Sequence, residues 1–301
     1  RRISTTRYLH SLIEKSPVFF CVVPYKLKVL PCIQIKISGE YRPNNNLLST
    51  TFMICSLLPV PRRLARCFSS SIIPTYHPPQ IIGDLRLIKT NELKDNDNKR
   101  IMDVVAQSPH TYGIGVLDGI VGELFIKDSV ARVGWFDGIH YRLDEVQPDQ
   151  TTCFMVSAVV PQWIPVRVPD DVRSFSALES FISAAAVGAG FDPEGGEGVP
   201  VRLEAFASTL KWFIVNGEGN LKPDALQSFF RNVVTGGLDD VQIDALGFYS
   251  PTHKGQVSNP NAALHLHFAT DCTKEPFVGH LHDDIEIKPG SATLYLPRRM
   301  A

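Results

Sequence analysis

Two closely spaced pairs of histidines near the C-terminal end most constrain what this chain can fold into. His265 and His267 stand in the apolar segment LHLHF, and His280 and His282 stand in GHLH. Successive side chains of a β-strand point to opposite faces, so the two members of each pair share one face of their strand. The intervening loop is long enough for the second strand to return beside the first. We therefore expect two neighbouring strands whose imidazoles converge.

This pattern favours a metal centre over a purely structural role. A single buried histidine is usually satisfied by the surrounding protein, but two such pairs on adjacent apolar strands are seldom accidental, because every buried imidazole needs a polar partner. Three imidazoles with one open coordination position are typical of a catalytic zinc site. Spacing alone leaves open whether His280 or His282 completes the set with His265 and His267.

Composition excludes several other classes of protein. The 30 Lys and Arg residues nearly balance the 31 Asp and Glu residues, so the chain lacks the broad basic field of a sequence-independent nucleic-acid binder. The six Cys include no CxxC pair, which argues against a disulfide scaffold or a cysteine-based zinc finger. No stretch has the roughly 18–20 uninterrupted apolar residues of a spanning helix. We expect no nucleic-acid partner and no membrane span.

The N-terminal quarter differs in composition from the rest, and we expect residues 1–80 to be a disordered leader. Residues 41–83 contain no acidic side chain, and the segment from Met53 is rich in Arg and Ser, as transit peptides are. We interpret 53–75 as transit-peptide-like and 1–52 as translated upstream sequence, since the chain begins with Arg. The expected location is mitochondrial, or cytoplasmic if the leader carries no address.

Residues 81–301 are expected to form the catalytic region, with an α+β fold of mixed or antiparallel β-sheets and a few flanking helices. Strands outnumber helices, and strict βαβ alternation is absent. Expected helices cover 101–106, 176–187 and 221–234, with Ser174 or Ser176 as a cap of the second and Gly236-Gly237 ending the third. Expected strands cover 122–127, 130–136, 154–160, 199–215, 241–249, 264–269, 285–287 and 293–296.

Several segments resemble, in order, those of the α-acetolactate decarboxylase family. The most specific block is GFYSP at 247–251, followed by LHLHF at 264–268 and by Gly279-His280. YGIG at 112–115, with the Gly-Glu step at 122–123, is similar to an N-terminal block of that family. The matches extend from about residue 100 to residue 297. The resemblance implies the family's two-part α/β architecture.

The resemblance also implies site residues and an activity. His265, His267 and His280 would bind Zn²⁺ or another divalent transition metal, Glu123 would match the active-site glutamate, and Lys211 would stand nearest to the family's substrate-binding arginine. The activity would be that of a carboxy-lyase, which converts 2-acetolactate, a small 2-hydroxy-3-oxo acid, to acetoin and CO2. A Lewis-acidic metal suits this reaction because it stabilises the enediolate left by CO2, and a carboxyl group can then protonate it.

Departures from the family keep other functions open. Lys211 lacks the bidentate fork of arginine. The chain ends shortly after Pro297, where the family continues with a tail that carries a further glutamate. We therefore expect either a truncated or a diverged member. The alternative function is a metal-binding relative without decarboxylase activity, which would serve as a binding or structural module.

Three further questions stay open from the sequence. A small DNA-binding domain of the plant- and prokaryote-conserved type also carries such histidines, but it is about half this size, and the neutral charge disfavours it. His282 is left as a substitute ligand or as a group beside the site. A homodimer is left open as the assembly.

Overall fold

The computed structural model describes residues 75–85, 99–217, 233–270 and 276–299. The chain divides into two compact units, Arg1–Ile72 and Ile73–Ala301, and every described residue belongs to the second unit. The expected upstream segment 1–52 and the expected transit segment 53–75, except for its last residue, lie outside the described residues. The first strand begins at His77, ahead of the expected start of the folded region at residue 81.

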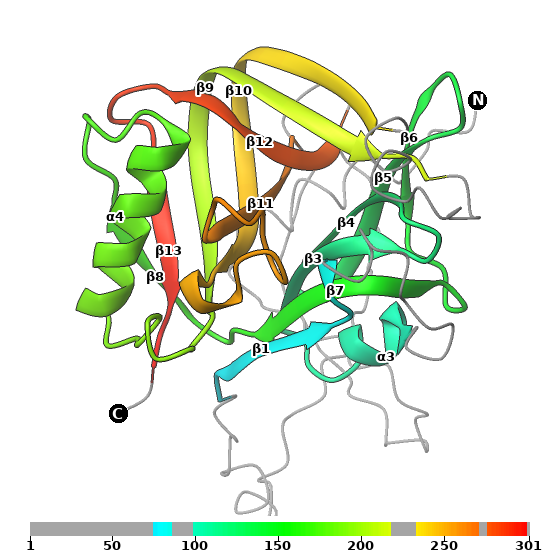
Figure 1. The fold of residues 1–301 in the computed structure, drawn as a ribbon, viewed down its shortest axis with the longest axis horizontal. Helices are drawn as coiled ribbons and strands as arrows, with labels where there is room; N and C mark the ends of the chain where they lie inside the picture. Colours follow the sequence, from blue (N-terminus) through cyan, green and yellow to red (C-terminus); the bar gives the residue numbers. More distant parts are fainter. Residues whose placement is uncertain (1–74, 86–98, 218–232, 271–275, 300–301) are drawn as a thin grey trace, which may run out of the picture. The chain divides into compact units, whose positions relative to one another are not determined.

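The fold is built mainly from antiparallel β-sheets with few helices, as the sequence predicts (Figure 1). Its elements in chain order are β1 (His77–Ile82), β2 (Lys99–Arg100), α3 (Ile101–Val105), β3 (Thr111–Leu117), β4 (Val121–Lys127), β5 (Val130–Phe136), β6 (Tyr141–Glu145), β7 (Thr151–Val159), β8 (Trp163–Arg167), α4 (Phe175–Gly188), β9 (Val199–Val215), β10 (Val233–Tyr249), the 3₁₀ turn η3 (Pro251–His253), β11 (Leu264–Ala269), β12 (Val278–Ile287) and β13 (Thr293–Pro297).

The first sheet has the strand order β1-β7-β3-β4-β5-β6, and β2 pairs with β7. The β4–β5 hairpin turns through Asp128 and Ser129, whose φ angles are 47° and 62°. Such left-handed residues match the twist of a two-residue hairpin turn. α3 covers one face of this sheet, where Ile101 and Val104 pack with Leu124 in an apolar cluster.

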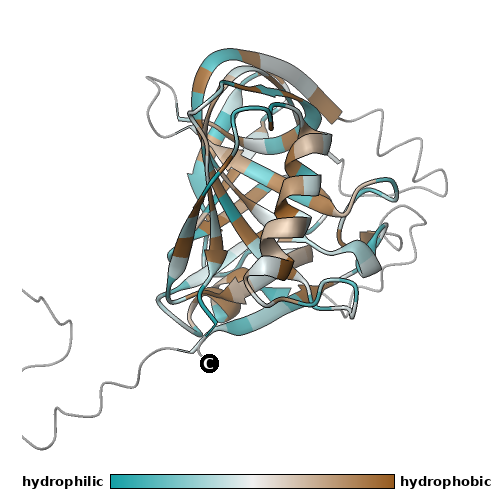
Figure 2. Cartoon of the chain, turned by 90° about the vertical axis from the view of Figure 1, so that its left-hand side faces the viewer, coloured by the Kyte–Doolittle hydropathy of each residue, from teal (hydrophilic) through white to brown (hydrophobic). Residues whose placement is uncertain are grey.

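The second sheet has the strand order β10-β11-β12-β9-β13-β8, and an additional pairing between β9 and β10 closes the first four strands into a ring. β9 and β10 are each 17 residues long and form one long antiparallel hairpin. α4 packs on one face of this sheet through four buried residues, Phe175, Leu178, Ile182 and Ala186. Figure 2 looks from the side of α4 and shows hydrophobic and hydrophilic positions alternating along the strands beside it.

The two sheets share an apolar interior that positions the site. Ile114, Phe125 and Phe154 of the first sheet pack in one cluster with Leu246 and Phe248 of the second. On β4, the neighbours of Phe125 along the chain point to the opposite face, so Glu123 lies on the same face as Phe125. A carboxyl group is thereby directed into the interior between the sheets.

The structure confirms several predicted elements and corrects others. α4 confirms the predicted helix 176–187 and extends it by one residue at each end. Ser174 caps this helix by accepting a hydrogen bond from the Ala177 amide. The helix predicted for 221–234 lies outside the described residues except for its last two, which begin β10. Gly236 and Gly237 are strand residues and not a helix end, because Gly236 pairs with Trp212, whose ring fills the space that a Cβ would need.

The strand predicted for 285–287 is longer than its apolar residues suggest. β12 begins at Val278, so both histidines of the second pair lie on it. The short strands β6 and β8 were not predicted, because an edge strand with few apolar residues lacks a clear alternation. Within the described part of the chain, no helix has the length and apolar character needed to cross a membrane.

Candidate metal centre

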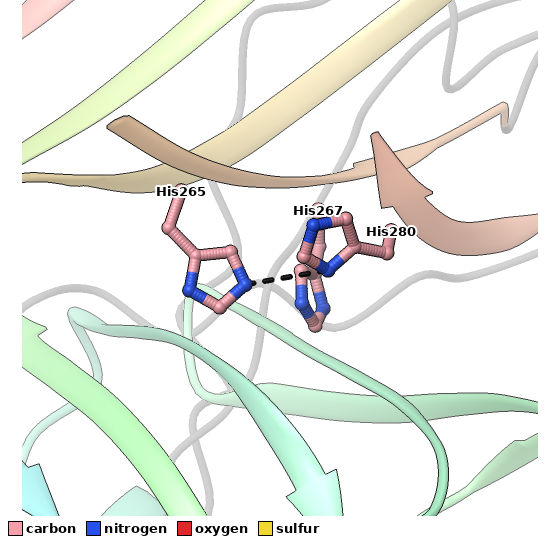
Figure 3. A group of neighbouring side chains, drawn as sticks. All are labelled: His265, His267 and His280. Atoms are coloured by element: carbon pink, nitrogen blue, oxygen red, sulfur yellow. Dashed lines mark hydrogen bonds between the residues drawn. The ribbon is translucent and has the colours of Figure 1, made fainter. Parts of the chain in front are cut away.

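Three histidines from two neighbouring strands converge on one point between the sheets. β11 pairs with β12 so that His267 lies directly opposite His280, and His265 lies two positions earlier on the same face of β11. One ring nitrogen of each histidine lies within 4.8 Å of the corresponding nitrogens of the other two. Figure 3 shows the three rings directed toward one another. The β-strand spacing predicted this convergence.

The geometry fits a transition-metal ion. Nε2 of His265 and Nδ1 of His280 are 3.3 Å apart. Two ligands at the zinc–nitrogen distance of about 2.0–2.1 Å in tetrahedral geometry are separated by about 3.3–3.4 Å. A set of three imidazole nitrogens is also the donor chemistry that Zn²⁺ and similar ions prefer.

Backbone carbonyl groups orient two of the three rings. Nδ1 of His265 lies 2.5 Å from the carbonyl oxygen of Val257, and Nδ1 of His267 lies 2.9 Å from that of Leu124. A carbonyl can only accept, so each Nδ1 is the protonated nitrogen that donates. The Nε2 atoms of both rings therefore carry the free lone pairs. This arrangement fixes the tautomer that a metal ligand requires.

Glu123 on β4 lies beside this cluster and is almost completely buried, with 1% of its surface exposed. Its Oε1 accepts a hydrogen bond of 3.0 Å from the Val215 amide at the end of β9. Its Oε2 lies 3.3 Å from Nε2 of His267 and 4.0 Å from Nδ1 of His280. The structure thus brings together four of the five predicted site residues.

Electrostatics favour the neutral forms of these groups. Burial raises the pKa of Glu123 well above its usual range, and the Val215 amide offsets this only in part. Burial, followed by the neighbouring imidazoles, lowers the pKa of His267 and of His280. Burial thus opposes an ion pair between Glu123 and His267, whose Oε2 and Nε2 atoms are 3.3 Å apart. Neutral imidazole is also the form that binds a metal.

Aromatic rings cover two of the histidines. Phe213 stacks on His280 with ring centroids 3.9 Å apart and an interplanar angle of 23°. Phe154 lies parallel to His265 with centroids 6.1 Å apart. His280 is the most accessible of the three ligands, with 22% of its side chain exposed, whereas His267 has 1%.

Two other residues singled out from the sequence lie elsewhere. Lys211 is exposed and forms an ion pair of 2.5 Å with Asp284, and no described contact joins it to the histidines or to Glu123. His282 is about half exposed, and its Nδ1 is 2.5 Å from the Asp283 carboxylate. The group of three converging ring nitrogens does not include His282.

Sequence reasoning missed several groups that build the site. The Leu124 and Val257 carbonyls and the Val215 amide are backbone groups, which carry no residue-specific signal. Phe213 was likewise not singled out from the sequence as a site residue. Phe213 lies beside the site because it pairs with His280 across the β9–β12 ladder. The alternation of residues along β9 was the one sequence signal for this position.

Comparisons with known proteins support the fold. No protein-family model matches the sequence, and no curated protein matches it. Acetolactate decarboxylase from Bacillus subtilis subspecies spizizenii has a similar structure, with a TM-score of 0.57 and 14% identity over 74% of this chain and 86% of that one. The enzyme from Bacillus subtilis strain 168 gives a TM-score of 0.55 and 15% identity over the same shares of the two chains.

A protein of unknown function from Staphylococcus aureus, described as similar to α-acetolactate decarboxylase, gives a TM-score of 0.54 and 16% identity. That match covers 72% of this chain and 84% of the other. At these identities the likeness establishes a shared fold, and activity must be argued from the site.

Proposed function

We propose that this protein is a metal-dependent carboxy-lyase that converts 2-acetolactate to acetoin and CO2. The observation that carries the proposal is the convergence of three ring nitrogens with a buried carboxyl group inside an acetolactate-decarboxylase-like fold. His265, His267 and His280 are the proposed ligands of Zn²⁺ or another divalent transition metal. Glu123 is the proposed catalytic carboxyl group.

The reaction balances with one proton. The bond between C2 and the carboxylate breaks, its electron pair stays on the remaining 2-hydroxy-3-oxo fragment as an enediolate, and one proton adds to carbon to give acetoin. A divalent cation at the three histidines would supply Lewis acidity toward the hydroxyl and keto oxygens. Glu123 would hold and deliver the proton, and this role is supported by the position of its Oε2, which lies beside the proposed ligand atoms and is buried.

The residues around the centre favour a small substrate that approaches past His280. The Phe213 ring would meet apolar groups of that substrate, since it stacks on the exposed ligand. A role for Lys211 in holding the substrate carboxylate stays a prediction from the sequence. Its exposed ion pair with Asp284 gives that role no support.

The decisive test is a turnover assay on the full chain loaded with Zn²⁺. Racemic acetolactate should yield acetoin and CO2 in equal amounts, and the Glu123→Gln variant should bind the metal without turnover. His282→Ala serves as the control, since His282 lies outside the ligand set. Bound metal without any turnover in the parent protein would refute the lyase and support a metal-binding relative without decarboxylase activity.

Two further proposals concern location and assembly. We propose mitochondrial targeting by residues 53–75, and a fusion of residues 53–80 to a fluorescent reporter should enter mitochondria. A cytosolic signal would contradict the proposal and leave the protein cytoplasmic. The homodimer left open by the sequence is tested by measuring the solution mass of the full chain.

A further inference from the structure

His280 differs from the other two proposed ligands because no carbonyl group orients its ring. It directs Nδ1 toward the cluster, and within the described residues no hydrogen-bond partner contacts its Nε2. Its position must therefore come from the backbone of β12 and from packing. The stacked ring of Phe213 provides packing on one side. One edge of β12 at residues 278–280 pairs with β11, and its other edge needs a separate support because the pairing with β9 reaches no further than His280.

The ladder between β9 and β12 ends at this point. The pairing includes Phe213 with His280, and two positions further in the same register Val215 would face Val278. That pair does not form, and side chains of the first sheet take its hydrogen bonds. Glu123 accepts from the Val215 amide, at 3.0 Å. Tyr141 accepts from the Val278 amide through its hydroxyl oxygen, at 2.7 Å, and donates to the Val278 carbonyl oxygen, at 3.2 Å.

The surroundings of Tyr141 hold it in place for these two bonds. Its ring stacks on Phe277 with centroids 4.4 Å apart and contacts the edge of Phe136. Gly134 on β5 allows the close approach of β12, because a Cβ there would lie 2.2 Å from the Val278 carbonyl oxygen and 2.7 Å from the Tyr141 hydroxyl. Gly134 also pairs directly with Glu123. The backbone two residues before His280 is thus anchored to the strands that carry Glu123.

We propose that Tyr141 is a positioning residue for the third metal ligand. By bonding both backbone groups of Val278, its hydroxyl holds the edge of β12 that faces away from β11 and fixes His280 relative to Glu123. This inference rests on the metal centre of the proposed function, but not on decarboxylation. It predicts that the hydroxyl of Tyr141 contributes to metal affinity although it lies outside the ligand set.

The test compares Tyr141→Phe with Tyr112→Phe in the full chain. Both variants lose one tyrosine hydroxyl from the first sheet. Tyr112 bonds Asp128 and packs edge-on against Trp163, so its loss does not touch β12. Tyr141→Phe should raise the dissociation constant for Zn²⁺, measured by chelator competition, about tenfold. Tyr112→Phe should leave that constant unchanged. The Tyr141 variant should also alter the visible spectrum of the Co²⁺-loaded protein.

A metal-free measurement separates positioning from general destabilisation. Amide hydrogen exchange at Val278 should accelerate in Tyr141→Phe and stay unchanged in Tyr112→Phe. Gly134→Ala, which displaces the same contact sterically, should reproduce the loss of metal affinity if the variant folds. Equal Zn²⁺ affinity in Tyr141→Phe and the parent would overturn the proposal while leaving the metal centre intact. A parent protein that binds no metal would overturn both.

Discussion

β11 and β12 contribute to the same centre in different ways. The two histidines of β11 are buried, and each donates a hydrogen bond from Nδ1 to a backbone carbonyl. The histidine of β12 is partly exposed and depends on a stacked ring and on an anchored backbone. Hydrogen bonds thus fix two ligands individually, whereas the third depends on how the two sheets are joined.

The two histidines on β11 are held more rigidly than the histidine on β12. A ligand whose second nitrogen is bonded cannot rotate without breaking a buried hydrogen bond, at a cost of about 0.5–1.5 kcal/mol. A ligand held by stacking can move at a smaller cost, and this ligand is the partly exposed one. We infer that β11 sets the position of the proposed metal ion, whereas β12 carries its most exposed ligand.

The largest expected effect comes from His267→Ala. This variant should lose measurable metal binding, and without metal its free energy of unfolding should fall by about 0.5–1.5 kcal/mol beyond the loss of packing, because the buried hydrogen bond to the Leu124 carbonyl is removed. Metal analysis and denaturant titration measure both. The matched variant His280→Ala should also bind metal poorly, but it should unfold at a higher denaturant concentration than His267→Ala. Equal destabilisation of the two would remove the contrast between the strands.

Glu123→Gln should reduce turnover of acetolactate by about 10²–10⁴-fold, the usual contribution of a proton-transferring group. The amide oxygen can still accept from the Val215 amide, so Zn²⁺ affinity should stay within a few-fold of the parent. Steady-state kinetics measures the change in turnover, and chelator competition measures the Zn²⁺ affinity. Turnover that survives the substitution would assign the proton transfer to another group.

Phe213→Leu should weaken Zn²⁺ binding by a few-fold, because the aromatic stack on His280 is worth about 0.5–1.5 kcal/mol beyond its buried area. Phe154→Leu is the matched variant, since Phe154 faces a ligand that is already held by a hydrogen bond. We expect the second substitution to affect metal affinity less. A larger loss of Zn²⁺ affinity in Phe154→Leu than in Phe213→Leu would show that stacking contributes more to the ligand on β11.

The smallest effect is expected for Lys211→Ala. The side chain is exposed and paired with Asp284, so neither Zn²⁺ affinity nor the Michaelis constant for acetolactate should change measurably. Kinetics at low and high salt provide the measurement. A large rise in the Michaelis constant would restore Lys211 as the group that holds the substrate carboxylate.

Much of the fold and the ligand set could be predicted from the sequence, because both depend on local periodicity. Period-two spacing placed His265 and His267 on one face, and the short connection to the next strand brought His280 opposite. Glu123 could be assigned only through the family resemblance, since its strand belongs to the other sheet and no local pattern links it to the histidines.

The remaining features depend on long-range geometry. Irregular pairing between β9 and β12 interrupts the alternation after Leu281, so His282 leaves the face that carries His280. The same irregularity accompanies the outward position of Lys211. The proposed anchoring role of Tyr141 depends on the point where the β9–β12 ladder ends and β12 meets the first sheet. The residue pattern of a single strand does not contain that information.

The central claim is that three imidazoles hold one divalent ion beside Glu123. A crystal structure of the full chain grown with Zn²⁺, with anomalous data collected at the zinc absorption edge, tests it most directly. We predict one strong peak about 2.0–2.1 Å from Nε2 of His265, Nε2 of His267 and Nδ1 of His280. The absence of a peak at these rings, or a peak held by other residues, would contradict the account.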